Sequence, residues 1–286
     1  MKKIIVILLL VCLCGCYQEK YVDLNSINEI DDSNASNFDF DLYSKEYLLL
    51  RVSDLKIINK KNEDKRIYPA SLTKLATLAT VLKHVDNLDE TSSFSGEQYQ
   101  TLIDNDASIA YLKIGKEYSI RDLLYALVLP SGADAAVCLE NYFNSNGMSL
   151  IDEINTYVKQ LGCNDTNFVN TTGLHDDNHY TTINDLLKIV LDILSNDEGR
   201  QIIETLKYTS EDGMVFRSSI RLIGNGSTQI LGGKTGFTTE SGQSLIVLFK
   251  KNNRSYILLM ANAMGDPYND EHFHFDDAVE IINYLY

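Results

Sequence analysis

Residues 66–82 read RIYPASLTKLATLATVL, and this stretch decides the fold. Apolar residues recur at helical spacing from about Ser71 to Val85, which predicts a helix directly after Pro69. Within it, Ser71 and Lys74 are three residues apart, so both side chains lie on one face of the helix. A serine hydroxyl becomes a nucleophile only when a neighbouring group takes its proton. Lysine does so only if burial or nearby cations lower its pKa, so the pattern predicts a buried Lys74 as the base of Ser71.

A second segment, LVLPSGADAAVCLE at residues 127–140, places Ser131 on a turn after Pro130. Its hydroxyl is a candidate to relay a proton between Lys74 and a leaving amine. The alternative is that Ser131 only caps the helix that begins at Gly132, which is a common role for serine.

A third segment, ILGGKTGFTTESGQSL at residues 230–245, has Lys234 at the end of a β-rich run. The free edge of such a strand can pair with the backbone of a substrate, and the lysine and threonine side chains can bind a carboxylate. Glycine in this run lets a backbone approach closely, and the next N–H can join that of Ser71 as an oxyanion hole. The candidate substrate-binding residues are therefore Lys234, Thr235, Gly236, Phe237 and Thr238. A single Lys-Thr-Gly is no more than a polar turn, but three segments in this order favour one shared site.

The remaining pattern indicates an α+β fold. A hairpin is expected over 47–59, and β-rich runs occupy 228–234, 244–250 and 256–262. Between these ends lie helical patterns at about 119–130, 132–142, 149–161 and 183–194, and a last helix is expected at 275–286. We therefore predict an antiparallel sheet of N- and C-terminal strands flanked by helices, with a mostly helical middle subdomain.

The N-terminus has the pattern of an export signal. Lys2 and Lys3 precede an apolar run of residues 4–13, too short to cross a membrane, which needs roughly 20 apolar residues. Leu13-Cys14-Gly15-Cys16 resembles a bacterial lipobox, which predicts a signal peptide at 1–15 and lipid on Cys16. The alternative is an ordinary signal without lipid. Residues 16–40 are polar and acidic, which predicts a flexible tether, and 41–286 are expected to form one domain.

Charge and cysteine usage exclude some classes of function. A net charge of −15 argues against nucleic-acid binding, which leaves a basic footprint. Cys138 and Cys163 lie in apolar helical contexts, so we expect two free buried thiols, although an exported compartment would permit a disulfide. No cysteines or histidines have zinc-site spacing.

The three segments resemble the S-x-x-K, S-x-N and K-T-G motifs of the penicillin-recognising serine acyl-transferases. Pro-Ala-Ser-Leu-Thr-Lys and residues 168–189, FVNTTGLHDDNHYTTINDLLKI, further resemble serine-type D-alanyl-D-alanine carboxypeptidases, the low-molecular-mass penicillin-binding proteins. The likeness covers roughly residues 45–265.

The resemblance implies an exported hydrolase, and the lipid expected on Cys16 would anchor it to the outer face of the cell membrane. Ser71 would be acylated by a peptidoglycan stem peptide, with release of the terminal D-alanine and hydrolysis of the acyl-enzyme. β-Lactams would be covalent inhibitors, and no metal or cofactor is implied.

One position departs from the family. The second motif usually ends in asparagine, whose amide contacts the peptide and the catalytic lysine, and here it is Ala133. Loss of one such hydrogen bond costs a few kcal/mol of transition-state stabilisation. His175 and His179 are assigned no catalysis, and an ordering role in their loop is expected.

Two alternatives stay open. A class A β-lactamase needs a glutamate in an E-x-x-L-N loop, and no glutamate lies between Glu153 and Glu198. A sensor domain that binds peptidoglycan or β-lactam with little turnover is the second alternative, and the alanine of the second motif favours it.

Overall fold

A computed structural model describes residues 30–33, 35, 38, 40–220, 224 and 226–285. Its centre is a five-stranded antiparallel sheet in the order β2-β1-β9-β8-β7. The strands are β1 (Glu46–Arg51), β2 (Lys56–Lys61), β7 (Thr228–Thr238), β8 (Gly242–Lys251) and β9 (Arg254–Ala263). The N-terminal hairpin therefore joins the C-terminal strands, which confirms the predicted α+β fold with terminal segments sharing one sheet.

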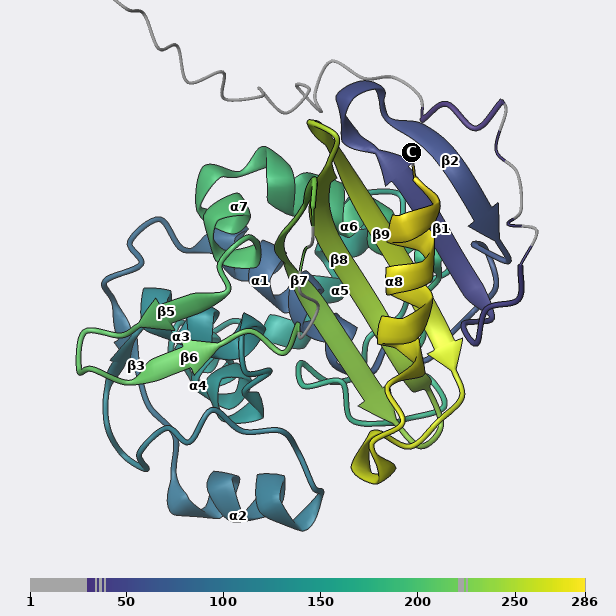
Figure 1. Cartoon of the computed structure of the whole chain (residues 1–286). Coiled ribbons are helices and arrows are strands. Elements are labelled where there is room, and N and C mark those ends of the chain that lie inside the picture. The colour runs from purple at the N-terminus through teal and green to yellow at the C-terminus, as the bar shows by residue number, and fades with distance from the viewer. Residues whose placement is uncertain are drawn as a thin grey trace, which may run out of the picture.

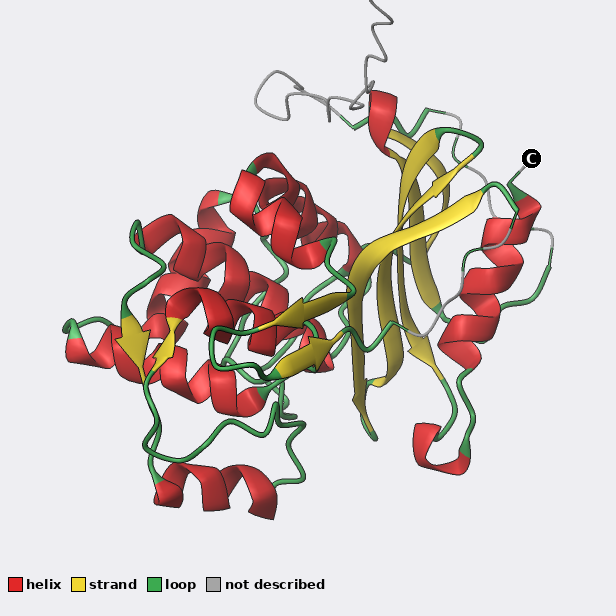
Figure 2. Ribbon diagram, turned by 60° about the vertical axis from the view of Figure 1, so that its left-hand side comes forward, coloured by secondary structure: helices red, strands yellow, loops and turns green. Residues whose placement is uncertain are grey.

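Alternate residues of the strands face opposite sides of the sheet and enter two cores. Leu48, Ile246 and Leu259 face the helical part of the molecule. Leu49 and Val247 belong instead to the second core, on the face that α8 (Phe273–Tyr284) covers. Figure 2 shows the resulting layers, with the helical subdomain, the sheet and α8 in succession.

The helical subdomain is built around the buried helix α1 (Thr73–His84). The elements that surround it are α2 (Gly96–Asp104), α3 (Ile120–Val128), α4 (Ala133–Ser145), α5 (Leu150–Gln160), α6 (Ile183–Ser195) and α7 (Asp197–Ile203). Serine or threonine side chains cap several of them: Ser119 accepts from the N–H of Asp122 at the start of α3, as its position predicts. Two small sheets, β3 (Thr91–Ser92) with β4 (Tyr118–Ser119) and β5 (Lys207–Thr209) with β6 (Val215–Arg217), edge this subdomain.

Two boundaries differ from those expected. Ser71 precedes α1 in the short 3₁₀ turn η3 (Ala70–Leu72) rather than in the helix itself. Strand β7 does not stop at Lys234 but continues to Thr238, because Lys234 to Thr238 pair with β8 over their whole length. The Lys-Thr-Gly segment is therefore part of an edge strand and not of a turn.

The signal peptide, Cys16 and most of the expected tether lie outside the described residues. The described residues between 30 and 40 contact the domain: the N–H of Ile57 donates to the carbonyl of Asp31 at 2.8 Å, and Phe38 is buried and stacks on Phe40. These described residues of the expected tether therefore contact the domain.

Two further sequence expectations concern the cysteines and the membrane. Cys138 and Cys163 are free and buried, as predicted, and burial raises the pKa of the Cys163 thiol to about 12. Across the described ranges, none of the helices has the length and apolar character needed to cross a membrane.

Candidate active site

Ser71 and Lys74 face each other at the start of α1. The Lys74 Nζ donates to the Ser71 Oγ at 3.1 Å and to the carbonyl of Thr172 at 2.5 Å. The first contact places a proton acceptor within reach of the nucleophile, as general-base catalysis requires.

Burial changes the chemistry of Lys74. The side chain is 1% exposed, and burial lowers its pKa to about 7, against the opposing attraction of the Asp134 carboxylate. A lysine in a dry site loses its proton more readily because the charged form is poorly solvated. Near neutral pH a large share of Lys74 is therefore uncharged and able to accept the proton of Ser71.

Ser131 points across the cleft toward β7. The Lys234 Nζ donates to the Ser131 Oγ at 2.9 Å and to the carbonyl of Thr235 at 2.8 Å. Helix α4 is capped by Gly132 without a side-chain hydrogen bond, so Ser131 is not its cap. Because Ser131 Oγ accepts from Lys234, its own hydrogen is free for another acceptor.

The same serine has a left-handed backbone. Its φ is 66°, a conformation uncommon for residues other than glycine, asparagine and aspartate. Such strain persists where the surroundings hold it and is concentrated at functional sites.

Strand β7 passes close to the nucleophile because it has a glycine there. A Cβ on Gly236 would lie 3.0 Å from the carbonyl oxygen of Pro69 and 3.3 Å from the backbone nitrogen of Ser71. Larger residues would therefore push the edge strand away from η3. The next residue is Phe237. Its N–H is the group that is predicted to form an oxyanion hole together with the N–H of Ser71.

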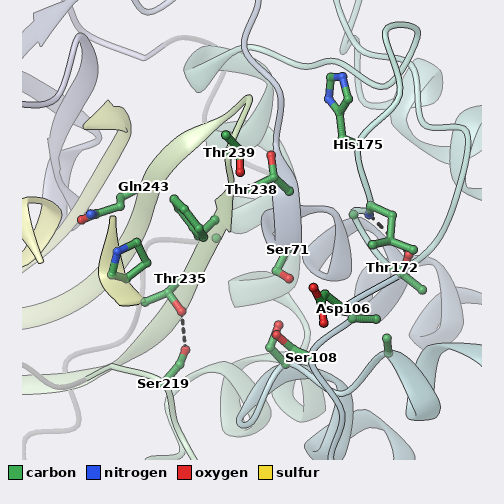
Figure 3. A pocket seen from close by; sticks show the side chains of 18 of the residues that line it. Ser71, Asp106, Ser108, Thr172, His175, Ser219, Thr235, Thr238, Thr239 and Gln243 are labelled. Carbon is green, nitrogen blue, oxygen red and sulfur yellow. Dashed lines mark hydrogen bonds between the residues drawn. The ribbon is translucent and has the colours of Figure 1, made fainter. Parts of the chain in front are cut away.

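The predicted residues line one cavity of about 760 Å³. Ser71, Lys74, Ser131, Thr235, Gly236, Phe237 and Thr238 all border it. Figure 3 shows Ser71 between the strand that carries Thr235 and Thr238 and a loop that carries Asp106 and Ser108. Lys234 lies behind this wall, fully buried. Burial and the charge of Lys74 lower its pKa well below the usual value.

The loop after α5 packs against the backbone of Ala70 and Ser71. A Cβ on Gly173 would lie 2.0 Å from the carbonyl oxygen of Ala70, so only glycine fits at this contact, where φ is 85°. Residues around it bind α1: the carbonyl of Thr171 accepts from Thr77 at 3.3 Å, and that of Thr172 accepts from Lys74. Residues 168–189, singled out in the sequence, thus contribute a backbone acceptor to the site.

His179 orders this loop, as expected. The N–H of Val169 donates to its Nδ1 at 3.1 Å, so the hydrogen is on Nε2, which lies 2.7 Å from the Thr73 Oγ1. Burial lowers the pKa of His179 to about 4, so the ring is neutral. The Thr73 hydroxyl in turn donates to the carbonyl of Ala70 at 2.7 Å. His175 differs, because it borders the cavity.

Ala133 also borders the cavity, with a methyl group at the last position of the second motif. Its N–H donates to the carbonyl of Ser108 at 2.7 Å. The adjacent Asp134 accepts from the N–H groups of Ala110 at 2.8 Å and Leu112 at 2.9 Å. This region is therefore held by bonds to backbone N–H groups, and Lys74 has the carbonyl of Thr172 as a hydrogen-bond acceptor.

Sequence reasoning missed two contributors. Thr172 acts through its carbonyl, a group that every residue carries. Ser219 accepts a hydrogen bond from Thr235 Oγ1 at 2.6 Å and borders the cavity, although it lies in no motif. The only signal for Ser219 is its hydroxyl on the segment that leads toward β7.

Comparison with known proteins finds matches to one family. A family model described as D-alanyl-D-alanine carboxypeptidase matches residues 32–265. The D-alanyl-D-alanine carboxypeptidase DacA of Haemophilus influenzae is 30% identical over 231 residues, which are 77% of this chain and 56% of that protein. DacF of Bacillus subtilis is 25% identical over 224 residues, 77% of this chain and 57% of that protein. The chain thus spans a little over half the length of these two curated relatives.

Solved structures share the fold over most of the chain. The crystal structure of the Streptomyces K15 DD-transpeptidase is similar with a TM-score of 0.75 and 25% identity, over 86% of this chain and 97% of that one. Penicillin-Binding Protein D2 from Listeria monocytogenes, in a cefotaxime-bound form, is similar with a TM-score of 0.73 and 26% identity, over 86% of this chain and 98% of that one.

Proposed function

Because the chain belongs to the D-alanyl-D-alanine carboxypeptidase family, we propose that it removes the terminal D-alanine of peptidoglycan stem peptides through an acyl-enzyme on Ser71. The observation that carries the proposal is the contact between the Lys74 Nζ and the Ser71 Oγ, 3.1 Å long, together with the lowered pKa of Lys74. A nucleophile paired with a base that is neutral near pH 7 is what acyl transfer needs.

Acylation begins with attack of the Ser71 Oγ on the carbonyl carbon of the penultimate D-alanine, while Lys74 takes the hydroxyl proton. The carbonyl oxygen becomes an oxyanion, which the N–H groups of Ser71 and Phe237 stabilise. Gly236 supports this assignment because it lets β7 lie against the backbone of Ser71. Thr235 and Thr238 are the residues of β7 proposed to orient the peptide.

The leaving amine needs a proton before the C–N bond breaks. Ser131 is the proposed donor, because Lys234 occupies a lone pair of its oxygen and leaves its hydrogen available. The proton lost by Ser131 is replaced from Lys74, which returns to its neutral state. Free D-alanine departs, and the stem peptide remains as an ester on Ser71.

Hydrolysis of the ester repeats the cycle with water. Lys74 accepts a proton from the water as it attacks the ester carbonyl, and then donates that proton to the Ser71 Oγ, which leaves as the alcohol. Peptidoglycan stem peptides are the proposed substrate and β-lactams the proposed covalent inhibitors. The cefotaxime-bound Listeria protein supports the second point by similarity.

Export and anchoring are proposed from the N-terminal pattern. Residues 1–15 would be cleaved as a signal peptide, and lipid on Cys16 would hold the domain at the outer face of the membrane. Intact-mass measurement of the protein from membranes tests this, since diacylglyceryl and acyl groups on Cys16 add a defined mass that a Cys16→Ala variant lacks.

One second candidate has support from an observation. The small side chain of Ala133 beside the cavity favours a domain that is acylated but turns over slowly. A β-lactamase of class A is less well supported, because residues 154–197 have no glutamate to activate the deacylating water.

Release of D-alanine from a pentapeptide ending in D-Ala-D-Ala separates these functions. Release above that of a Ser71→Ala variant is expected for a carboxypeptidase. Labelling of Ser71 by penicillin without release would favour the sensor, and rapid recovery of enzyme with hydrolysed penicillin would favour the β-lactamase.

A further inference from the structure

A carboxypeptidase must recognise the free carboxylate at the end of its substrate. Among the described residues that border the cavity, none is arginine and Lys74 is the only lysine. Lys74 is already used as the base of Ser71. Of the histidines there, burial lowers the pKa of His274 to about 4, so that ring is neutral. The other two histidines each lie beside an exposed carboxylate. The Nε2 of His175 is 3.7 Å from the Asp177 carboxylate, and the Nε2 of His272 is 3.4 Å from the Asp270 carboxylate.

A pair of hydroxyls occupies the place beside Lys234 where such a carboxylate would bind. Thr235 Oγ1 lies 2.6 Å from the Ser219 Oγ, and both residues border the cavity (Figure 3). The two hydroxyls have two hydrogens, and the bond between their oxygens uses one. One O–H therefore remains to be donated to a ligand in the cavity.

The position of Ser219 is fixed by the backbone of the catalytic turn. Its N–H donates to the carbonyl of Leu129 at 2.9 Å, and Leu129 precedes Pro130 and Ser131 directly. Leu129 itself is 1% exposed. The hydroxyl pair is thus held at a set distance from both Ser131 and β7, and such support is what a specific binding site requires.

Lys234 precedes Thr235 on β7 and is buried, which lowers its pKa in the absence of a bound anion. Its Nζ is bonded to the Ser131 Oγ and the Thr235 carbonyl, and an ammonium has three hydrogens, so one remains. A carboxylate bound by the Thr235 hydroxyl would lie near Lys234, because the Nζ of Lys234 is bonded to the carbonyl of the same threonine. The attraction between the two would hold the lysine in its charged form.

We propose that Ser219 determines specificity for a terminal carboxylate: with Thr235 it forms a hydroxyl pair that binds the carboxylate of the leaving residue in place of an arginine. This inference rests on the proposed function and adds a residue that no motif contains. It predicts that Ser219 matters only for acyl donors that carry a carboxylate.

The test compares two donors with each enzyme. The donors are a peptide ending in D-Ala-D-Ala with a free carboxylate and the same peptide as its C-terminal carboxamide. For Ser219→Ala we expect kcat/KM for the acid to fall about tenfold or more, since one hydrogen bond to a charged group is lost, while the carboxamide changes less than about twofold. Ser219→Thr, which keeps the hydroxyl, should restore most of the acid activity.

Acylation by benzylpenicillin and by its methyl ester gives the same comparison without peptide turnover. If the protein is acylated by penicillin but releases no D-alanine, the proposed carboxypeptidase activity is refuted. The ratio of the acylation rates with benzylpenicillin and with its methyl ester would still test the role of Ser219. Ser218→Ala is the matched control, because its hydroxyl accepts from the N–H of Ile220 and does not border the cavity. An equal loss for acid and ester in Ser219→Ala, or no loss for either, overturns the inference.

Discussion

The ammonium of Lys234 lies 2.9 Å from the hydroxyl oxygen of Ser131, and this bond joins the edge strand of the sheet to the turn before α4. Both groups are buried, with 0% and 6% of their surface exposed. The bond spans the interface between the sheet and the helical subdomain, on the floor of the cleft that contains Ser71. It orients the Ser131 hydroxyl so that its hydrogen faces away from Lys234.

Replacement of Ser131 by alanine tests the proton relay. We expect D-alanine release to fall by about 10²–10⁴-fold, because a positioned acid or base contributes a factor of this size. Acylation by a β-lactam should fall less than peptide acylation, since ring strain helps to break the bond to the ring nitrogen, which stays attached to the product. Rapid-mixing measurement of both rates provides the test, and an equal loss for the two donors would argue for a structural role instead.

The pH dependence of acylation follows from Lys74. Its pKa of about 7 means that the neutral base is lost below that pH. The second-order rate of penicillin labelling should therefore rise about tenfold per pH unit between 5 and 7 and level off above about 7. The labelling rate rises with pH, and does not fall, because the charged amine of Lys74 is unable to accept a proton.

A Lys74→Arg variant is the control for this profile. Arginine stays charged in proteins, so the variant should label very slowly at every pH. A wild-type rate that is flat from pH 5 to 9, or that falls as the pH rises, would contradict the role of Lys74 as the base.

The sequence predicted those parts of the molecule that local pattern determines. Apolar, β-rich runs near both ends of the chain predicted the strands of one sheet, and the motifs identified Ser71, Lys74 and Lys234. Helix α2 was missed because it is short and Leu102 is its only buried side chain.

The remaining site residues depend on tertiary contacts. The carbonyl of Thr172 meets Lys74 only because Gly173 lets its loop touch the backbone of Ala70. Ser219 enters the cavity because its N–H binds Leu129, a contact across 90 residues of chain that no local spacing encodes. Phe38 was assigned to a tether because its own segment is polar, although its ring is buried against Tyr47.

The substitution Ala133→Asn would restore the amide that the family usually has at this position. Ala133 is 1% exposed, and its methyl group borders a cavity with room for a larger side chain. We expect penicillin acylation to become about tenfold faster, the effect of one added hydrogen bond in the transition state. Ala133→Leu has a similar volume without the amide and should be slower than wild type. A rate that is unchanged or lower with asparagine would mean that the site is built around alanine, with the Thr172 carbonyl as the sufficient partner of Lys74.

A methyl group at Gly173 should displace the nucleophile. The added Cβ of Gly173→Ala would lie 2.0 Å from the Ala70 carbonyl oxygen and 2.9 Å from the Ser71 nitrogen, at a φ of 85° that already disfavours alanine. The matched control is Gly147→Ala, where φ is 73° and nothing lies within 4 Å of the new atom. The control variant suffers only the backbone strain, which lowers its free energy of unfolding by about 1 kcal/mol.

Urea unfolding and penicillin labelling measure the two consequences separately. The free energy of unfolding of Gly173→Ala should fall by at least about 1 kcal/mol more than that of the control. The reason is that the added Cβ would overlap Ala70 unless the loop or η3 shifts. Its labelling rate should fall at least about tenfold even when fully folded, since a shift of Ala70 moves Ser71 away from Lys74 and from the N–H of Phe237. If the two glycine variants lost the same stability and labelled at the same rate, the loop of residues 168–182 would not be what positions Ser71.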